Sequence, residues 1–411
     1  MTPGDAEVLI VGAGQAGAQV AITLRQLGFS GSITLAGAEP DPPYERPPLS
    51  KDYLAGERPA ERLLLRPPSF WAERGIRLCC GVRIVEIDAR ARTARTDGGL
   101  TLGWDRLVWA AGGEARRLDC PGAGLQGVHV IRTRADVDRL RADLGARARV
   151  AIIGGGYIGL EAASVLVGQG HRVALLEALD RLMARVAGPE VGAFYLAEHR
   201  ARGVDVRLSA SVAALEGTGR VEAVRLADGA RLPADVVIAG IGLAPSVGPL
   251  VAAGAEPALS GVLVDAHCRT TLSDVYAVGD CAAHPNVFAG GGIVRLESVQ
   301  NAVDMAKAAA AHLVGGDAAP PYRACPWFWS NQYDLRLQTV GLSQGADRRV
   351  VRGDPAARSW SLAYLRAGAL VALDCINAPR DYVQGRHLVE RAAAVDPARL
   401  ADPAVPLKEL L

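Results

Sequence analysis

The stretch Val8-Leu-Ile-Val-Gly12-Ala-Gly14-Gln-Ala-Gly17 recurs later in the chain as Val150-Ala-Ile-Ile-Gly154-Gly-Gly156-Tyr-Ile-Gly159. In each copy an apolar run leads into Gly-x-Gly-x-x-Gly, and an amphipathic stretch follows, over 15–27 and 158–169. A second apolar run comes next, over 32–36 and 172–177. Strand, glycine turn, helix and strand in this order predict a parallel sheet covered by helices. The repeat therefore predicts an α/β protein with two Rossmann-like dinucleotide-binding domains.

Each glycine of these two fingerprints has a separate role. The first permits a tight turn, the second lets the backbone approach a pyrophosphate, and the third lets the helix pack closely on the strand. The pyrophosphate is held at the positive N-terminal end of the helix. The predicted cofactor-binding residues are Gly12, Gly14, Ala16 and Gly17 in the first copy, and Gly154, Gly156, Tyr157, Ile158 and Gly159 in the second.

An acidic residue at the end of the second strand is expected to bind a ribose hydroxyl. Glu177 follows Gly156 by 21 residues, which is the expected spacing, and Glu39 is the candidate in the first copy. A carboxylate at Glu177 repels a 2′-phosphate, so the pattern favours NADH over NADPH. Arg181 and Arg185 are close enough in sequence to weaken this preference, and Arg185 is also a candidate cofactor contact.

Two dinucleotide sites in one chain indicate two dinucleotides used together. The simplest such chemistry is hydride transfer from a nicotinamide to a flavin, so we expect FAD and NADH as cofactors. A third segment, 271–280, reads as an apolar strand that ends in Gly279-Asp280. The Asp280 carboxylate can accept hydrogen bonds from flavin ribityl hydroxyls, and Gly279 allows a close approach.

Composition and charge exclude several classes of protein. The 411 residues carry a net charge of +1, which indicates neither a nucleic-acid partner nor a membrane surface. The seven cysteines include no CxxC motif, so we expect no disulfide framework, metal site or redox dithiol. No signal peptide and no apolar run of 18 residues is evident, so we expect a cytoplasmic protein.

The expected domain order follows from the repeat and from a change of composition near residue 320. We expect an FAD-binding domain in two parts, 1–112 and 241–319, with an NAD-binding domain at 113–240 between them. Short runs at 204–208 and 221–226 suggest an antiparallel flap, and 236–239 suggests the last strand of the nucleotide sheet. Five strand-like runs between 327 and 377 and a helical pattern at 382–394 predict a C-terminal α+β domain at 320–411.

The chain also resembles the glutathione-reductase-like flavoprotein reductases, in particular the ferredoxin-reductase branch of the putidaredoxin and rhodocoxin reductase type. The resemblance covers essentially the whole chain. Besides the two fingerprints, the motifs that carry it are Pro43-Tyr-Glu-Arg-Pro-Pro-Leu-Ser-Lys51, Ala239-Gly-Ile-Gly242, Ala277-Val-Gly-Asp-Cys281, Glu297-Ser-Val-Gln-Asn301 and Trp327-Phe-Trp-Ser-Asn-Gln-Tyr333.

The resemblance implies further site residues. Lys51 is implied to lie beside the flavin ring and to pair with Glu161, while Glu161 and Glu297 are implied to contact the nicotinamide end of NADH. Further cofactor contacts are implied for Arg46, Ile84, Arg132, Gly242, Val299 and, with Trp327, Trp329. The sequence departs from the family pattern at Ala38, Ala111 and Ser246, which changes individual FAD contacts relative to that pattern.

The expected function is that of an NADH-dependent reductase that passes single electrons from FAD to a [2Fe–2S] ferredoxin. That ferredoxin would serve a monooxygenase, expected to be of the haem-thiolate type, and the family habit implies a monomer. A dithiol–disulfide reductase is disfavoured by the missing cysteine pair. A rubredoxin reductase, an NADH oxidase and a non-catalytic NADH-sensing flavoprotein similar to apoptosis-inducing factor stay open as alternatives.

Overall fold

The computed structural model describes residues 5–410, which pack as two compact units. The first unit comprises the chain up to Glu45, Leu63–Glu114 and Ala244–Pro326. The second comprises Arg46–Arg62, Ala115–Leu243 and the chain from Trp327 onward. Arg46–Arg62, which includes Lys51, thus groups with the second unit, although it falls within the first part of the predicted FAD-binding domain. The four-segment domain division stays a prediction.

The first unit is built on a mixed sheet in the order β3-β2-β1-β6-β5-β4, with β19 paired to β6. Its parallel part carries the first fingerprint, and Leu9 of β1 lies opposite Leu107 of β6. The strands are β1 (Asp5–Val11), β2 (Ile33–Gly37), β3 (Ile76–Cys80), β4 (Ile84–Asp88), β5 (Thr93–Thr96), β6 (Thr101–Trp109) and β19 (Val275–Ala277). The parallel strands are apolar and largely buried, as expected for a sheet covered by helices.

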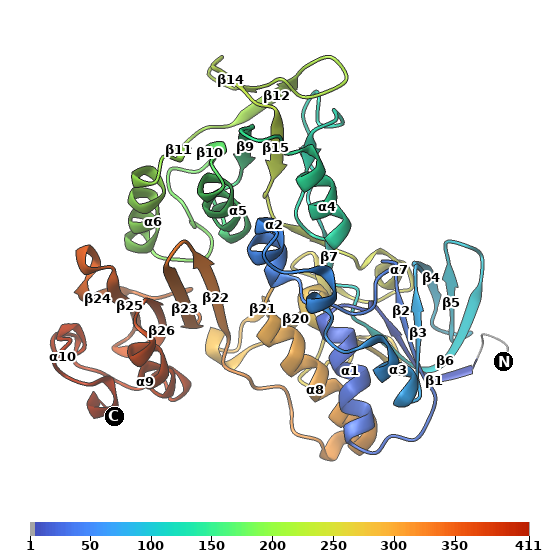
Figure 1. Ribbon diagram of the computed structural model, residues 1–411. Coiled ribbons are helices and arrows are strands. Elements are labelled where there is room, and N and C mark those ends of the chain that lie inside the picture. Colours follow the sequence, from blue (N-terminus) through green and yellow to red (C-terminus); the bar gives the residue numbers. More distant parts are fainter. Residues whose placement is uncertain (1–4, 411) are drawn as a thin grey trace. The chain divides into compact units, whose positions relative to one another are not determined.

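Two helices of the first unit, α1 (Gln15–Gln26) and α8 (Val299–Gly315), pack side by side (Figure 1). Both helices are rich in buried alanine, including Ala18, Ala306 and Ala310, and such small side chains allow close packing. The unit also contains α3 (Pro68–Glu73), α7 (Gly248–Ala252), and a small sheet of β17 (Pro257–Ala258), β18 (Gly261–Leu263), β20 (Ala282–Pro285) and β21 (Ile293–Arg295).

The second unit contains a five-stranded parallel sheet in the order β11-β10-β9-β15-β8. The strands are β8 (Val128–His129), β9 (Arg149–Ile153), β10 (Arg172–Leu176), β11 (Asp205–Arg207) and β15 (Val236–Ala239). The helices of this part of the chain are α2 (Asp52–Ala55), α4 (Arg134–Asp143), α5 (Tyr157–Gly168) and α6 (Pro189–Ala201). Both fingerprints therefore lie in strand–turn–helix–strand units, as the sequence predicts.

The assignment of 204–208 to an antiparallel flap is wrong. This segment forms β11, which pairs in parallel with β10, and Ala174 lies opposite Asp205. Helix α6, which the sequence pattern did not reveal, precedes β11 and makes the crossover that a parallel neighbour requires. The antiparallel flap begins one strand later and consists of β12 (Val212–Glu216), β13 (Ala223–Leu226) and β14 (Arg231–Pro233).

The C-terminal part of the second unit is an antiparallel sheet in the order β22-β23-β26-β25-β24. Its strands are β22 (Trp327–Gln332), β23 (Leu335–Gly341), β24 (Arg348–Asp354), β25 (Ser359–Arg366) and β26 (Ala369–Ile376). Helix α9 (Pro379–Glu390) packs on β26 and β23, and α10 (Pro397–Ala401) follows it (Figure 1). The helix predicted to reach residue 394 ends at Glu390, because the chain turns at Ala392, where φ is +46°.

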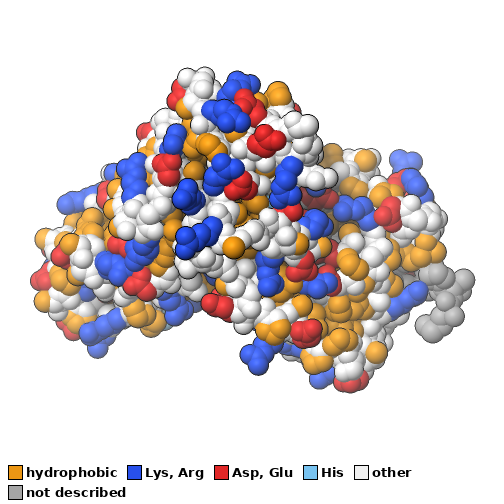
Figure 2. All heavy atoms as spheres, turned by 45° about the horizontal axis from the view of Figure 1, so that its top comes forward, with side chains coloured by type: hydrophobic (Ala, Val, Ile, Leu, Met, Phe, Trp, Pro, Cys, Tyr) orange, Lys and Arg blue, Asp and Glu red, His pale blue; other side chains and the backbone are white. Residues whose placement is uncertain are grey.

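Charged side chains of both signs are interspersed on the face shown in Figure 2, in keeping with the small net charge. Among residues 5–410, no helix has the length and apolarity needed to cross a bilayer. Within the same range, no three His, Cys, Asp or Glu side chains gather as they would around a metal ion. None of the seven cysteines, all of which the structure describes, forms a disulfide.

Candidate functional site

The first fingerprint forms a turn that only glycine can make. Gly12 has φ +110°, and a Cβ atom there would lie 2.3 Å from the carbonyl oxygen of Ala110. At Gly17 a Cβ atom would lie 1.9 Å from the carbonyl oxygen of Gly12. Gly14 is the N-cap of α1, no side chain caps the helix, and its first turn holds no acidic residue. Its N-terminal N–H groups therefore suit a phosphate.

The second fingerprint repeats this geometry in the second unit. Gly154 has φ +111° with a Cβ position 2.3 Å from the carbonyl oxygen of Gly240, and the Cβ position of Gly159 lies 2.1 Å from the carbonyl oxygen of Gly154. Gly156 is the N-cap of α5, and a Cβ atom added there would have no atom within 4 Å, so the space beside it is open. Ile158 in the first turn is 41% exposed, and Gly242 after β15 has φ +106°. The residues present thus fit a second pyrophosphate.

Glu177 lies at the glycine turn of this second fingerprint. Its Oε2 accepts a hydrogen bond from the Gly155 N–H at 2.7 Å, and its Oε1 accepts one from the Leu179 N–H at 2.8 Å. Arg181 donates to the backbone carbonyls of Ala184 and Ala187, whereas Arg185 is exposed. A fixed carboxylate with remaining acceptor capacity suits a ribose diol.

In the first unit, Gly279, with φ +79°, lies close to the start of α1. Its Cβ position would be 3.2 Å from the Ala16 Cβ and 3.7 Å from the Ala302 Cβ in α8. Asp280 follows directly, and Val299 opens α8, which is capped by the Ser298 hydroxyl. Three candidate FAD-binding segments therefore converge on one place in this unit.

Two other predicted FAD contacts, Glu39 and Ile84, lie at the end of β2 and at the start of β4, which are not adjacent strands of the sheet. Glu39 follows β2, accepts a hydrogen bond from the Tyr44 hydroxyl at 2.5 Å, and has its backbone carbonyl bound by the Gly81 N–H at 2.8 Å. Ile84 opens β4 and is buried in the core of the unit. Glu39 is therefore held in place despite Ala38 standing where the family carries an acid.

Arg295, which sequence reasoning did not single out, contacts two of the predicted site residues. Its Nη2 atom lies 2.8 Å from the Glu297 carboxylate, and its Nη1 donates to the Asp280 carbonyl oxygen at 2.7 Å. The Glu297 side chain is 42% exposed and belongs to the first unit. The available signal for Arg295 was its place two residues before Glu297, in the motif that precedes α8.

Lys51 and Glu161 form a salt bridge in the second unit, with Lys51 Nζ 2.6 Å from Glu161 Oε2. Their side chains are only 13% and 2% exposed. Lys51 Nζ also donates to the carbonyl oxygen of Pro47 at 3.1 Å. Lys51 follows the short helix Pro47–Ser50, whose prolines stiffen the segment and fix where the lysine starts.

Two serines that sequence reasoning did not single out complete the surroundings of Glu161. The Ser50 hydroxyl donates to Oε2 at 2.5 Å, and the Ser330 hydroxyl of β22 donates to Oε1 at 2.6 Å. Both serines are fully buried. Glu161 is therefore a buried carboxylate with a cation and two hydroxyl donors, which is how a buried charge is kept.

The remaining predicted residues of the second unit fall into two groups. Arg46 Nη1 donates to the Arg132 carbonyl oxygen at 2.7 Å. Trp327 and Trp329 are half-buried neighbours on β22, with ring centroids 5.6 Å apart, and Phe328 between them stacks on Tyr157 at 4.5 Å. The β22 strand thus brings Phe328 against the start of α5 and Ser330 against Glu161.

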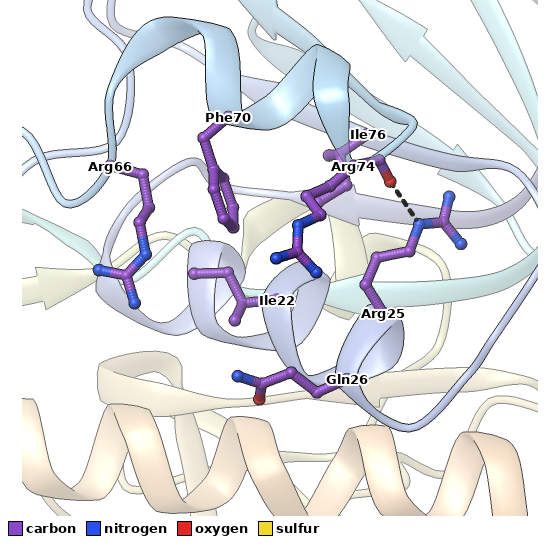
Figure 3. Close-up of a pocket in the computed structure, with 7 residues that line it drawn as sticks. All are labelled: Ile22, Arg25, Gln26, Arg66, Phe70, Arg74 and Ile76. Carbon is purple, nitrogen blue, oxygen red and sulfur yellow. Dashed lines mark hydrogen bonds between the residues drawn. The ribbon is translucent and has the colours of Figure 1, made fainter.

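A surface pocket of about 270 Å³ lies elsewhere, between α1, α3 and β3 (Figure 3). Phe70 stands between the guanidinium groups of Arg66 and Arg74, 5.7 and 5.5 Å from its ring centroid, while Arg25 is bound to backbone carbonyls. The pocket is formed by the C-terminal half of α1, so it is separate from the fingerprint at the other end of that helix.

Comparisons with known proteins agree with this geometry. Residues 6–306 match the model of the pyridine nucleotide-disulphide oxidoreductases, and residues 327–411 match a reductase C-terminal domain. The chain is 57% identical to the 5,5′-dehydrodivanillate O-demethylase ferredoxin reductase subunit of Sphingobium sp. (strain NBRC 103272 / SYK-6), over 98% of each chain. It is 54% identical to a ferredoxin–NAD(P)(+) reductase of Sphingomonas sp., over 100% of this chain and 99% of the relative.

The structure is also similar to that of putidaredoxin reductase in its covalent complex with putidaredoxin. The TM-score is 0.95 at 40% identity, covering 99% of this chain and 98% of the other. The predicted fold class and the predicted resemblance are confirmed by these matches.

Proposed function

This chain belongs to the pyridine nucleotide-disulphide oxidoreductase family, and on that premise we propose that it is an FAD-dependent, NADH-oxidising reductase of a [2Fe–2S] ferredoxin. The observation that carries the proposal is the pair of glycine turns before α1 and α5, in a chain that matches named ferredoxin reductases over nearly its whole length. We further propose that the ferredoxin serves a monooxygenase of the haem-thiolate type. The reductase is proposed to act as a monomer in the cytoplasm, where NADH is produced.

Different residues of the chain are proposed to bind FAD and NADH. FAD, when bound, accepts a hydride from NADH and gives up its electrons singly. The start of α1 holds one pyrophosphate and the start of α5 holds the other. Glu177, fixed by Gly155, binds the ribose of the nicotinamide dinucleotide and disfavours a 2′-phosphate. Glu39, Asp280 and Val299 hold FAD.

The Lys51–Glu161 pair supplies a fixed charge at the reacting ring in this proposal. The Lys51 ammonium is restrained by Glu161 and by the Pro47 carbonyl, so its position needs no reorganisation during the reaction. Glu297, held by Arg295, is the second carboxylate proposed to contact the nicotinamide end. Neither group needs to act as a general acid or base, because hydride transfer requires none.

Anaerobic stopped-flow absorbance at the flavin band tests the function. We expect rapid bleaching by NADH, slower bleaching by NADPH, and reduction of cytochrome c only when a [2Fe–2S] ferredoxin is added. A rubredoxin in place of the ferredoxin tests in the same assay whether the chain is a rubredoxin reductase.

An NADH oxidase and a redox sensor have distinct outcomes in this experiment. Bleaching followed by rapid reoxidation with oxygen, without dependence on ferredoxin, would indicate an NADH oxidase. Slow electron transfer together with a dimer that forms on adding NADH, measured by light scattering, would indicate a redox sensor. Absence of bleaching by either nucleotide would refute the assignment of the second fingerprint.

A further inference from the structure

A buried chain of hydrogen bonds runs from Glu161 through the second unit. The Ser330 hydroxyl donates to Glu161 Oε1 at 2.6 Å, and Gln332 Nε2 donates to the Ser330 oxygen at 3.2 Å. Gln332 Oε1 lies 2.9 Å from His199 Nε2, and His199 Nδ1 lies 2.9 Å from the Tyr333 hydroxyl. Glu161, His199, Ser330 and Gln332 are all at most 2% exposed. Ser330, Gln332 and His199 therefore connect the Glu161 carboxylate to Tyr333.

The donors in this chain all point toward Glu161. Gln332 presents its amide nitrogen to Ser330, so its oxygen faces His199 and can only accept. His199 must then carry its proton on Nε2, which leaves Nδ1 to accept from the Tyr333 hydroxyl. Burial lowers the pKa of His199 to about 4, so the ring is neutral and carries the single proton that this arrangement requires.

Hydrogen bonds running in the opposite direction, from Glu161 toward Tyr333, would leave Glu161 Oε1 without a donor. If the Gln332 amide were reversed, the Ser330 hydroxyl would donate to Gln332. Two oxygen atoms, Ser330 Oγ and Glu161 Oε1, would then face each other at 2.6 Å with no proton between them. Oε2 accepts from Lys51 Nζ and from the Ser50 hydroxyl, and the Ser330 hydroxyl is the donor that Oε1 receives in the observed orientation. The acceptor role of Glu161 therefore fixes the donor-to-acceptor direction of every hydrogen bond between Glu161 and Tyr333.

The outer end of the chain is anchored by packing and charge. Tyr333 occupies the turn between β22 and β23 with φ +57°, a conformation that a tyrosine adopts only where its surroundings hold it. The Arg202 guanidinium lies over its ring at 4.4 Å from the centroid. Arg202 also binds Glu198 at 2.5 Å and Asp334 at 3.1 Å. The Tyr333 hydroxyl is thus fixed against His199 of α6.

We propose that Ser330, Gln332, His199 and Tyr333 are positioning residues that hold the Glu161 carboxylate in one orientation for the nicotinamide end of NADH. A carboxylate offers about four acceptor positions. Ser50 and Lys51 occupy two positions on Oε2, and Ser330 occupies one on Oε1. The position left over is on Oε1 and suits an N–H donor such as the carboxamide of nicotinamide. The inference rests on the proposed function and adds residues to its site.

The first test measures NAD⁺ affinity of the FAD-loaded protein by calorimetry. Ser330→Ala removes a hydrogen bond to a charged acceptor, so we expect the NAD⁺ dissociation constant to rise about tenfold, with Ser330→Thr restoring much of the affinity. Ser361→Ala is the matched control, because Ser361 is equally buried in the same sheet but donates to Asp381 at 3.0 Å. Equal weakening in both alanine variants, or none in Ser330→Ala, would overturn the proposal.

The second test determines the direction of the hydrogen bonds from the tautomer of His199, in the absence of any nicotinamide nucleotide. In ¹⁵N NMR spectra of the FAD-loaded protein, His199, assigned by its loss in His199→Gln, is expected to show a protonated Nε2 and an unprotonated Nδ1. Tyr333→Phe should shift the Nδ1 resonance, because that nitrogen loses its donor. A protonated Nδ1 in the wild type would overturn the proposal. Failure of the wild type to bind NAD⁺ with this tautomer intact would instead count against the proposed function.

Discussion

Replacing Gly154 with alanine tests whether the second glycine turn holds the nicotinamide dinucleotide. The backbone at Gly154 resists a side chain for two reasons. Its φ of +111° is unfavourable for alanine, at a cost of about 1–2 kcal/mol. The new Cβ would also lie 2.3 Å from the Gly240 carbonyl oxygen and 2.8 Å from its carbon, and neither backbone atom can rotate away. The turn must therefore move by about an ångström, and a misplacement of that size costs on the order of a hundredfold in a positioned reaction.

The assay is anaerobic reduction of the flavin over a range of NADH concentrations. Gly154→Ala is expected to lower the second-order rate constant of flavin reduction by NADH about a hundredfold while leaving the FAD content unchanged, because Gly154 belongs to the second unit. Gly229→Ala is the matched control, since Gly229 also has a positive φ of +88° but no atom within 4 Å of its Cβ position. Gly12→Ala is the reciprocal variant and is expected to release FAD.

The reasoning would be refuted in either of two ways. Gly154→Ala could retain the NADH dependence of the wild type, which would mean that the turn does not hold the nucleotide. It could also lose FAD while binding NADH normally, which would mean that the two fingerprints are assigned in the wrong order.

Three further predictions concern single side chains. Glu177→Ala should lower the preference for NADH over NADPH, as the ratio of kcat/KM values, by about tenfold, and an unchanged ratio would contradict the ribose assignment. Arg295→Ala should raise the FAD dissociation constant about tenfold in dialysis, because the Asp280 carbonyl loses its hydrogen bond from Arg295 Nη1, and Arg295→Lys should retain part of the affinity. Burial raises the pKa of Asp374 to about 7. The folded chain thus keeps a proton that the unfolded chain releases near pH 4, so this carboxyl's stabilising contribution is full below about pH 4 and is lost as pH rises to about 7. Denaturant unfolding across this range should show the wild type losing up to about 4 kcal/mol relative to Asp374→Asn, and parallel pH profiles would contradict the prediction.

The two nucleotide-binding folds could be predicted because their signals are local. A glycine turn, the helix that it opens and the strand before it lie within about twenty residues, and their backbone conformation depends on residue type alone. The same approach failed for 204–208, since whether a short apolar strand pairs in parallel or antiparallel depends on the element that precedes it. The unrecognised α6 decided that pairing.

The sequence by itself determined the fold class, the two glycine turns and the choice of Glu177 as the ribose-binding acid. Strand and helix periodicity, positive φ and the helix dipole all depend on residues that are close together in the sequence. The family resemblance implied the Lys51–Glu161 pair, which spacing alone does not indicate. Only the tertiary structure decided that Ser50 and Ser330 complete the surroundings of Glu161, and that His199 of α6 meets Gln332 and Tyr333 of the C-terminal sheet. A hydrogen bond between residues 169 positions apart depends on where the chain returns, and no local pattern records that return.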